Sequence, residues 1–463
     1  MLILRDAQHV FTGTAAAPAD GLEPGGDVVV EDGVVVSLAS TPGTPGTPST
    51  PSTSSAAGTT SPDSSTEVLD ASGCVVTPGL VNAHHHLLQS AFRTLPGTRG
   101  VAMRDWLPTM AAAYSSVGVD PELAHAAALT AVAEGLLSGV TTVADHHLTW
   151  PAAMSTDETV ALAAATASAA RELGGRLVFV RGAARDDAAQ AAESADAIAE
   201  SLAPARGGLT GDGMLQVAIG PAGVHSDGRD TFERFGEVAA RRGLRRRTQA
   251  NEQVDVAIAL ERYGRRPIDL LDEWGWLEPD VTLAHLCDAT DAEIALLAER
   301  GVTATHAPGC DLPMGWGIAP VAALRDAGLP VGLGTSGGGS NDAGHLLADA
   351  RLAMQVAPLA GRPLTAREVL SMATHGSATG LGRPELGMLA PGSAADLCVW
   401  DVSGVADAGV ADPVAGLLWA NPGRRPRHVV VAGRVVVRDY ALVAADERAI
   451  AADLAALLTA RRP

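Results

Sequence analysis

The sequence predicts an α/β fold, a (β/α)8 TIM barrel with a small β-sandwich domain formed from both chain ends. Two observations predict it. From about residue 75 to residue 384, short apolar runs typical of buried strands alternate with amphipathic stretches typical of helices. Before and after that region, short apolar runs follow one another with turn residues between them, which is typical of antiparallel strands.

The first β-rich region covers residues 1–39, where glycine and aspartate separate the runs MLILRDAQHVFTG and GGDVVVEDGVVVSLAS. Residues 40–66 are low-complexity Ser/Thr/Pro/Gly sequence with almost no apolar side chain to bury, so we expect a disordered insertion. We therefore assign residues 1–77 to the N-terminal part of the small domain. The barrel takes residues 78–384.

Eight strand-like runs lie in the barrel region: CVVTPGLVNAHHH, VTTVADHH, RLVFVRG, MLQVAIGPAGVHS, LRRRTQANE, VTLAHL, VTATHAP and PVGLGTSG. Helical stretches separate them, for example DPELAHAAALTAVAEGLLSG after the first run and DETVALAAATASAAREL after the second. After residue 385 the runs GSAADLCVWDV and RHVVVAGRVVV return to strand patterning. Residues 385–463 therefore complete the small domain and end in a terminal helix.

Composition excludes several classes of function. The net charge of −20 disfavours nucleic acid as a partner, because phosphate binding calls for a basic surface. The chain contains no lysine, which excludes Schiff-base, Walker A and carboxylated-lysine chemistry. Its four cysteines show no CxxC pairing, which suits a reducing compartment and argues against a cysteine zinc site. With no leader pattern and no uncharged apolar run of about 18 residues, we expect a soluble cytoplasmic protein without membrane contact.

Unusual polar residues fall at the predicted strand ends, where a barrel of this kind carries its chemistry. They are His84, His85 and His86 in the first run, Asp145, His146 and His147 in the second, Gln249 and Glu252 in the fifth, His285 in the sixth, His306 in the seventh and Ser336 in the eighth. A single histidine at a strand end is usually a hydrogen-bonded structural residue. The joint placement of so many polar residues on one rim favours a functional site instead.

The histidine spacing predicts a metal site. His84 and His86 are two residues apart on a strand, so they share one face, whereas His85 points the other way. Two imidazoles on one face can bind a divalent metal at about 2.0–2.1 Å, and His285 converges from another strand. Three histidines with an open position form a catalytic arrangement, in which the metal activates water. Glu252 on the same rim can transfer protons between that water and a leaving group.

With these motifs the chain resembles the amidohydrolase superfamily, and within it the mononuclear metal aminohydrolases that include triazine hydrolases and 8-oxoguanine deaminases. The resemblance covers nearly the whole chain. It rests on TPGLVNAHHHLLQSAFR, GVTTVADHHL, LERYGRRPIDLLDEWGWL, VTLAHL, DLPMGWGIAPVAALRDAGLPVGLGTSGGGSND and ELGMLAPGSAADLCVWD. It implies metal-dependent hydrolysis of a non-peptide C–N bond, or of a C–halogen or C–S bond, on a nitrogen heterocycle or amidine.

The resemblance also places the ligands. It assigns the metal to His84, His86 and His285, with one Zn2+ per chain and Fe2+ as the alternative. The fifth-strand motif is normally histidine, two residues and glutamate; here it reads QANE, with Gln249 at the histidine position and Glu252 intact. An amide oxygen is a weaker zinc ligand than imidazole, so Gln249 is a poor fourth ligand, is replaced by water, or marks a site that has lost tight binding. At the position where the family usually has an aspartate on strand eight, this chain has Ser336. The triazine hydrolases also carry a hydroxyl residue at that position. Glu252 is then the acid/base residue that the resemblance leaves.

We expect substrate contacts from Gln89, Trp106 and His306. Asp311 and Trp316 are further candidates for substrate contact. The predicted function is a metal-dependent hydrolase of a small heterocyclic amine, with a homodimer or higher homo-oligomer as the assembly. Gln249 and Ser336 together support two alternatives. One is a metal-poor homologue that binds a planar heterocycle without hydrolysis, and the other is a redirected, non-hydrolytic enzyme such as a lyase.

Overall fold

The computed structural model describes residues 1–16, 22–40, 66–152 and 154–461. The predicted insertion at residues 40–66 therefore lies outside the described residues apart from its two end residues, of which Ser40 closes a strand. Within the described ranges, no helix is both long and apolar enough to cross a membrane.

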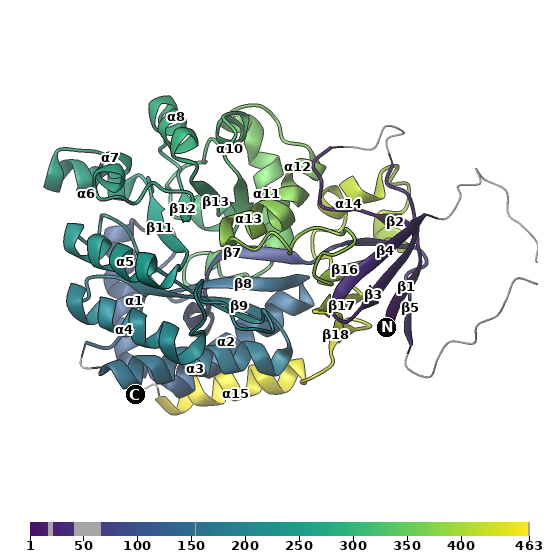
Figure 1. The fold of residues 1–463 in the computed structure, drawn as a ribbon, viewed down its shortest axis with the longest axis horizontal. Coiled ribbons are helices and arrows are strands. Elements are labelled where there is room, and N and C mark those ends of the chain that lie inside the picture. Colours follow the sequence, from purple (N-terminus) through teal and green to yellow (C-terminus); the bar gives the residue numbers. More distant parts are fainter. Residues whose placement is uncertain (17–21, 41–65, 153, 462–463) are drawn as a thin grey trace, which may run out of the picture.

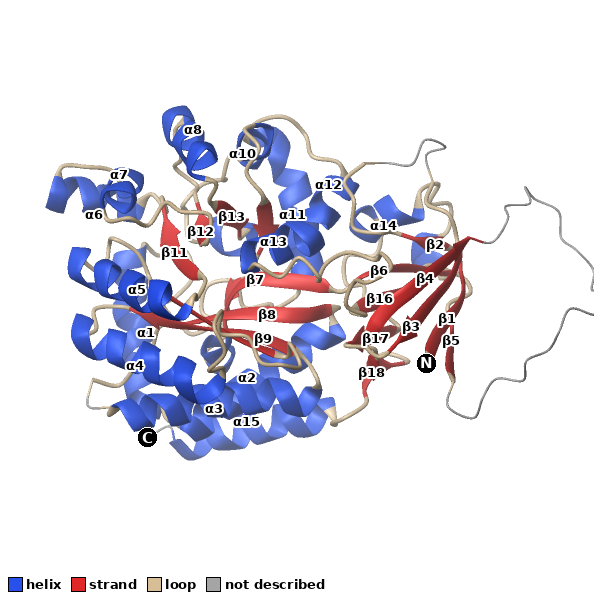
Figure 2. Cartoon of the chain, viewed as in Figure 1, coloured by secondary structure: helices blue, strands red, loops and turns tan. Residues whose placement is uncertain are grey.

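A closed ring of parallel strands forms the barrel. Figure 2 shows several of these strands with helices around them. The barrel strands are β7 (Leu80–His86), β8 (Val140–His147), β9 (Arg176–Ala183), β10 (Leu215–Pro221), β11 (Arg246–Ala250), β12 (Val281–His285), β13 (Thr303–His306), β14 (Val331–Leu333) and β15 (Ser336–Gly337). The last two are parts of one predicted strand, because β14 pairs with β13 and β15 pairs with β7. The predicted (β/α)8 barrel is confirmed.

Helices surround this ring and follow the strands in the alternation that the sequence predicts. They are α1 (Met103–Val117), α2 (Pro121–Leu137), α3 (Thr156–Leu173), α4 (Ala188–Leu202), α5 (Arg229–Arg242), α6 (Val254–Tyr263), α7 (Pro267–Glu273), α8 (Asp291–Arg300), α9 (Pro308–Asp311), α10 (Val321–Asp326), α11 (Leu346–Val356), α12 (Ala366–Ser371) and α13 (Ser377–Leu381). Short 3-10 and π turns connect some of them, among them η1 (Leu87–Ala91) directly after β7 and the π turn η3 (Met372–Gly376) between α12 and α13.

Local signals explain where several helices begin. Asp120 caps α2 by accepting a hydrogen bond from the Leu123 backbone, and Pro121 at the first helical position suits the fixed φ of proline. Ser155 and Glu158 form a capping box at the start of α3, which satisfies two backbone N–H groups that the helix itself leaves unpaired.

The small domain is a sandwich of two sheets. One contains β1 (Leu2–Ala7), β3 (Gly26–Glu31), β4 (Val34–Ser40) and β5 (Glu67–Asp70); the other contains β2 (His9–Val10), β6 (Cys74–Pro78), β16 (Leu397–Asp401), β17 (His428–Val431), β18 (Arg434–Arg438) and β19 (Ala441–Leu442). The two sheets share an apolar core that includes Leu4, Val28, Val76, Leu397 and Val430. Because β16 pairs with β6, both chain ends build one sheet, as predicted.

Figure 1 shows the sandwich beside the barrel and the terminal helix α15 (Glu447–Arg461) lying along α2 on the barrel side. Leu454 of α15 packs into the same apolar cluster as Leu123 and Ala127 of α2. The segment between β16 and β17 carries the seven-residue helix α14 (Pro413–Trp419). The C-terminal region therefore contributes both to the sandwich and to the outer layer of the barrel.

A buried ion pair joins the two parts of the molecule. Arg176, at the start of β9, binds both carboxylate oxygens of Asp396, which precedes β16, at 2.8 and 2.9 Å. Asp396 also accepts a hydrogen bond from the backbone of Ala432 at 2.8 Å. Both charged side chains are almost fully buried, so each depends on the other to offset its loss of hydration.

We expect Asp396→Asn to destabilise the protein by about 3 kcal/mol or more, because it leaves the buried Arg176 guanidinium without a counter-charge. Urea denaturation followed by circular dichroism measures the change. The exposed pair of Asp230 and Arg234 on α5 supplies the control, and Asp230→Asn should leave the denaturation midpoint nearly unchanged. Equal midpoints for the two variants would contradict a stabilising role for the buried pair.

Candidate metal centre and active site

Three histidine rings converge at the C-terminal rim of the barrel. The centroid of the His84 ring lies 4.9 Å from that of His86 and 5.1 Å from that of His285. His85 lies between the first two along β7 but turns away, and its Nδ1 hydrogen-bonds to the carbonyl oxygen of Ser336. The period of two along a strand therefore separates the HHH motif into two inward rings and one ring that ties β7 to β15.

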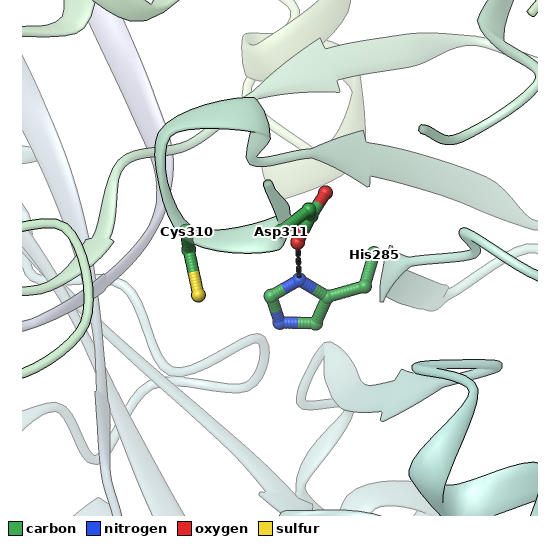
Figure 3. Close-up of side chains that lie close together, drawn as sticks. All are labelled: His285, Cys310 and Asp311. Atoms are coloured by element: carbon green, nitrogen blue, oxygen red, sulfur yellow. Dashed lines mark hydrogen bonds and ion pairs between the residues drawn. The ribbon is translucent and has the colours of Figure 1, made fainter. Parts of the chain in front are cut away.

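Hydrogen bonds at Nδ1 fix the orientation of two of these rings. His86 Nδ1 lies 2.6 Å from the carbonyl oxygen of His146, and His285 Nδ1 lies 2.6 Å from Asp311 Oδ1 (Figure 3). A carbonyl and an ionised carboxylate only accept hydrogen bonds, so each ring carries its proton on Nδ1. The Nε2 lone pair of His86 is then available to a metal, and Nε2 of His285 becomes available when it is released from its contact with Gln249 Oε1.

Gln249 and Glu252 approach the same point from β11. Gln249 Oε1 lies 3.1 Å from His285 Nε2, and Glu252 Oε1 lies 3.6 Å from it. The strand ends at Ala250, so Glu252 stands on a tight turn between Asn251 and Gln253, whose φ angles are 55° and 60°. The Asp255 carboxylate holds this turn by accepting hydrogen bonds from the Asn251 and Glu252 backbone N–H groups.

The donor set fits a divalent cation. Within the described residues, His84 Nε2 and both carboxylate oxygens of Glu252 are buried without a hydrogen-bond partner. Unpaired buried polar atoms are costly, and the Glu252 carboxylate lies beside His285, whose Nε2 is 3.1 Å from Gln249 Oε1. A cation bound among the histidine rings would give His84 Nε2 a partner, and imidazole nitrogens are good zinc ligands. The residues that would hold the ion are His84, His86 and His285, with Gln249 beside them as a weaker oxygen donor.

Burial sets the protonation of these groups. It holds the pKa of His84 well below its usual value, so that ring is neutral and can act as a ligand. It raises the pKa of Glu252 to about 8. Burial also acts against ionisation of Asp311, but the neighbouring His285 and His306 rings outweigh it and lower the pKa of that carboxyl to about 2. Asp311 is therefore the permanent negative charge behind the His285 ring.

A cavity of about 730 Å³ opens onto this cluster, which is within the range of small-molecule sites. Of the residues with predicted roles, His86, Gln89, Trp106, Gln249 and Ser336 line it. Its outer wall comes from α1 and from the segment after β13, including Met103, Leu107, Met110, Tyr114, Met314 and Trp316. The Trp316 ring stands edge-on to His285, with centroids 5.0 Å apart.

The structure separates His306 from the other predicted substrate contacts. It does not line the cavity among the described residues, and its Nδ1 lies 3.5 Å from Asp311 Oδ2. Trp106 also has a structural role, because its indole N–H donates to the Gly339 carbonyl at 3.1 Å. Gln89 accepts a hydrogen bond from the Gly339 N–H at the same distance, so the two side chains fix the loop after β15.

Sequence reasoning missed two positioning carboxylates. Asp311 was considered only for substrate contact, although it orients His285, and Asp255 was not singled out although it holds the Glu252 turn. Asp255 follows the glutamate by three residues at the start of a helical stretch, a spacing typical of side chains that bind helix N-terminal N–H groups. Asp311 gave no comparable signal, because its partner lies 26 residues earlier in the chain.

Comparison with known proteins identifies the family. A family model described as "Amidohydrolase family" matches residues 75–436. The chain is 35% identical to 8-oxoguanine deaminase of Pseudomonas aeruginosa over 98% of its own length and 99% of the relative's. It is 31% identical to 5-methylthioadenosine/S-adenosylhomocysteine deaminase 2 of Archaeoglobus fulgidus, covering 82% of this chain and 86% of that protein.

Among solved structures, atrazine chlorohydrolase from Arthrobacter aurescens TC1 complexed with zinc is similar with a TM-score of 0.85 and 32% identity, covering 99% of this chain and 100% of that one. The chain therefore belongs to the amidohydrolase family. Family membership confirms the prediction of a hydrolase that acts on bonds other than peptide bonds. The zinc in the solved structure supports the zinc cofactor predicted from the sequence.

We expect His86→Ala to reduce the bound metal from about one ion per chain to nearly none, because it removes one of three imidazole donors. Metal analysis of freshly purified protein measures this, and circular dichroism checks that the barrel is folded. His125 forms a surface contact with Glu172, so His125→Ala is the matched control and should keep its metal. Unchanged metal content in His86→Ala would rule out the proposed ligand set.

Gln249→His should tighten metal binding by about 10-fold or more, equivalent to about 1.4 kcal/mol, because imidazole is a better zinc donor than an amide oxygen. A competitive chelator titration at one pH compares the two proteins, since histidine binds metal in its deprotonated form. Gln253→His, on an exposed side chain of the same turn, is the control and should leave affinity unchanged. Equal affinity in Gln249→His would mean that residue 249 does not face the ion.

Proposed function

We propose that this protein is a zinc-dependent deaminase of a small nitrogen heterocycle, in which water replaces an exocyclic amino group and ammonia leaves. One observation carries the proposal: within the described residues, His84 Nε2 and both Glu252 oxygens are buried without a hydrogen-bond partner, and they belong to the histidine cluster beside a cavity, lined by His86, Gln249 and Ser336, that is large enough for a planar ring. The near full-length similarity to 8-oxoguanine deaminase supports this substrate class.

Bound zinc supplies a polarising charge that makes water nucleophilic near neutral pH. The chain's own residues do the rest. Glu252 holds and moves the protons, since both of its oxygens face the site without another partner in the described structure. It is the acid/base group closest to the histidine cluster that is not already hydrogen-bonded, because Asp311 and Asp255 are both engaged.

The other cavity residues position the substrate. Ser336 lines the cavity and can hydrogen-bond to the attacking water, although a hydroxyl cannot take its proton as a carboxylate does. Trp106 and Trp316 offer flat apolar walls to a planar ring, and Gln89 offers an amide at the wall beside His86. Most of the wall is apolar, so water is displaced when a ring enters the cavity.

The metal-free binding protein and the lyase are less well supported. The relatives named above are deaminases and a chlorohydrolase, and all of these reactions replace a leaving group with water. The chlorohydrolase supports including halogenated triazines in any substrate screen. The cytoplasmic location and the homodimer or higher homo-oligomer stay predictions.

We expect Glu252→Gln to lower the rate of ammonia release by roughly 10²–10⁴-fold while metal content stays the same, because the amide cannot transfer protons. The assay screens purines, pteridines, pyrimidines and triazines for ammonia or halide release and then uses the best substrate. Glu261→Gln on the exposed face of α6 is the control and should retain full activity. Full activity in Glu252→Gln would remove this residue from the mechanism.

A further inference from the structure

Cys310 lies beside the predicted metal ligands, although the sequence pattern gave it no role. It belongs to α9, immediately after β13, and its side chain is 1% exposed. The donor atoms of His285, Cys310 and Asp311 all lie within 4.8 Å of one another. In Figure 3 the sulfur faces the edge of the imidazole ring that carries both nitrogens.

The sulfur also lines the substrate cavity, together with His86, Gln249 and Ser336. Cys310 therefore lies near the histidine cluster, the Gln249 amide and the Ser336 hydroxyl. The Ser336 and Ser340 hydroxyls are its polar neighbours on the strand-eight side. The His84 ring, whose Nε2 is buried without a hydrogen-bond partner, lies 5.1 Å from the His285 ring that Cys310 approaches.

The other donors proposed for the metal carry no negative charge, so an anionic ligand would complement the cation. Three imidazoles, the Gln249 amide and the Ser336 hydroxyl are all neutral donors. Asp311 is negative, but its Oδ1 is engaged with His285 Nδ1, so it orients that ring from behind. Glu252 is the proposed proton carrier and cannot serve as a permanent ligand without losing that role.

We propose that Cys310 Sγ binds the metal as a thiolate and supplies the negative charge that the Ser336 hydroxyl lacks. This inference rests on the proposed metal-dependent function. On binding, the S–H bond breaks, its proton leaves to solvent and the sulfur donates an electron pair to the ion. Thiolate is a good zinc ligand, so Cys310 would add one anionic donor to the imidazoles of His84, His86 and His285.

The distances allow this assignment. A zinc ion binds sulfur at about 2.3 Å and imidazole nitrogen at about 2.1 Å, so two such ligands lie at most about 4.4 Å apart. The ligand atoms of His285, Cys310 and Asp311 lie within 4.8 Å of one another, which is close to this limit. A small side-chain rotation would close the difference. Cys310 is also held in place, because its backbone N–H donates to the Ala307 carbonyl at 3.0 Å.

Cys287 provides a matched comparison. It is the second residue after β12 and is also close to Asp311, but it does not line the cavity among the described residues. Both thiols are free, and both lie near the same carboxylate. If proximity to Asp311 alone decided metal binding, the two cysteines would behave alike.

The test replaces the native metal with Co2+, whose near-ultraviolet charge-transfer absorption reports thiolate ligands and does not depend on activity. We expect this absorption in the unmodified protein, its loss in Cys310→Ser and its retention in Cys287→Ser. A chelator titration of the same proteins should show that Cys310→Ser weakens metal affinity by at least about 10-fold, since even indirect partners of metal ligands cost that much.

The unmodified protein alone can overturn the proposal: a Co2+ form without thiolate absorption excludes Cys310 as a ligand, even if Cys310→Ser fails to fold. Retention of the band in a folded Cys310→Ser variant does the same. These outcomes are distinct from failure of the proposed function. A protein that binds Co2+ through His86 without thiolate absorption keeps the metal centre and loses only the Cys310 assignment, whereas absence of any metal binding contradicts both.

Discussion

Closure of the barrel between its first and last strands is the constraint on which the site depends. Strand eight changes partner at Gly334, from β13 to β7, and a Cβ atom at that position would lie 2.7 Å from the backbone oxygen of His84. Only glycine permits so close an approach of two backbones. The closed ring brings β7, which carries His84 and His86, into the same rim as β11 and β12.

The site gathers polar atoms in a place where water is scarce. Buried donors and acceptors without partners are normally destabilising, and here they belong to His84 and Glu252. Their cost is offset when a cation binds, which is why binding and stability are coupled at such centres. The remaining polar groups, such as His86 Nδ1 and His285 Nδ1, are already satisfied by His146 and Asp311, so they hold the rings in place before any ion arrives.

Two departures from the pattern that the resemblance implies change the donor atoms of the centre, and one of them also removes a negative charge. Gln249 occupies an inward position of β11, close to His285, where it offers an oxygen in place of a nitrogen. Ser336 replaces a carboxylate at the start of β15, and its φ of 54° shows that the chain turns sharply there. A cation held by neutral donors alone keeps its full charge, so the permanently negative Asp311 and the ionisable groups Glu252 and Cys310 become its decisive neighbours.

The sequence by itself determined the alternation of strands and helices, the shared sheet of the two chain ends and the rim on which His84, His86, His285 and Glu252 stand. These features follow from local periodicity: inward and outward residues alternate along a strand, and parallel strands end on one side. Only the tertiary structure decided which groups touch. His306 lies beside Asp311 and does not line the cavity among the described residues. Asp311 orients His285, and Cys310 lies next to the His285 ring. Such contacts join residues from different strands and loops, and their geometry depends on how the barrel closes and how the connecting turns bend, which no local pattern encodes.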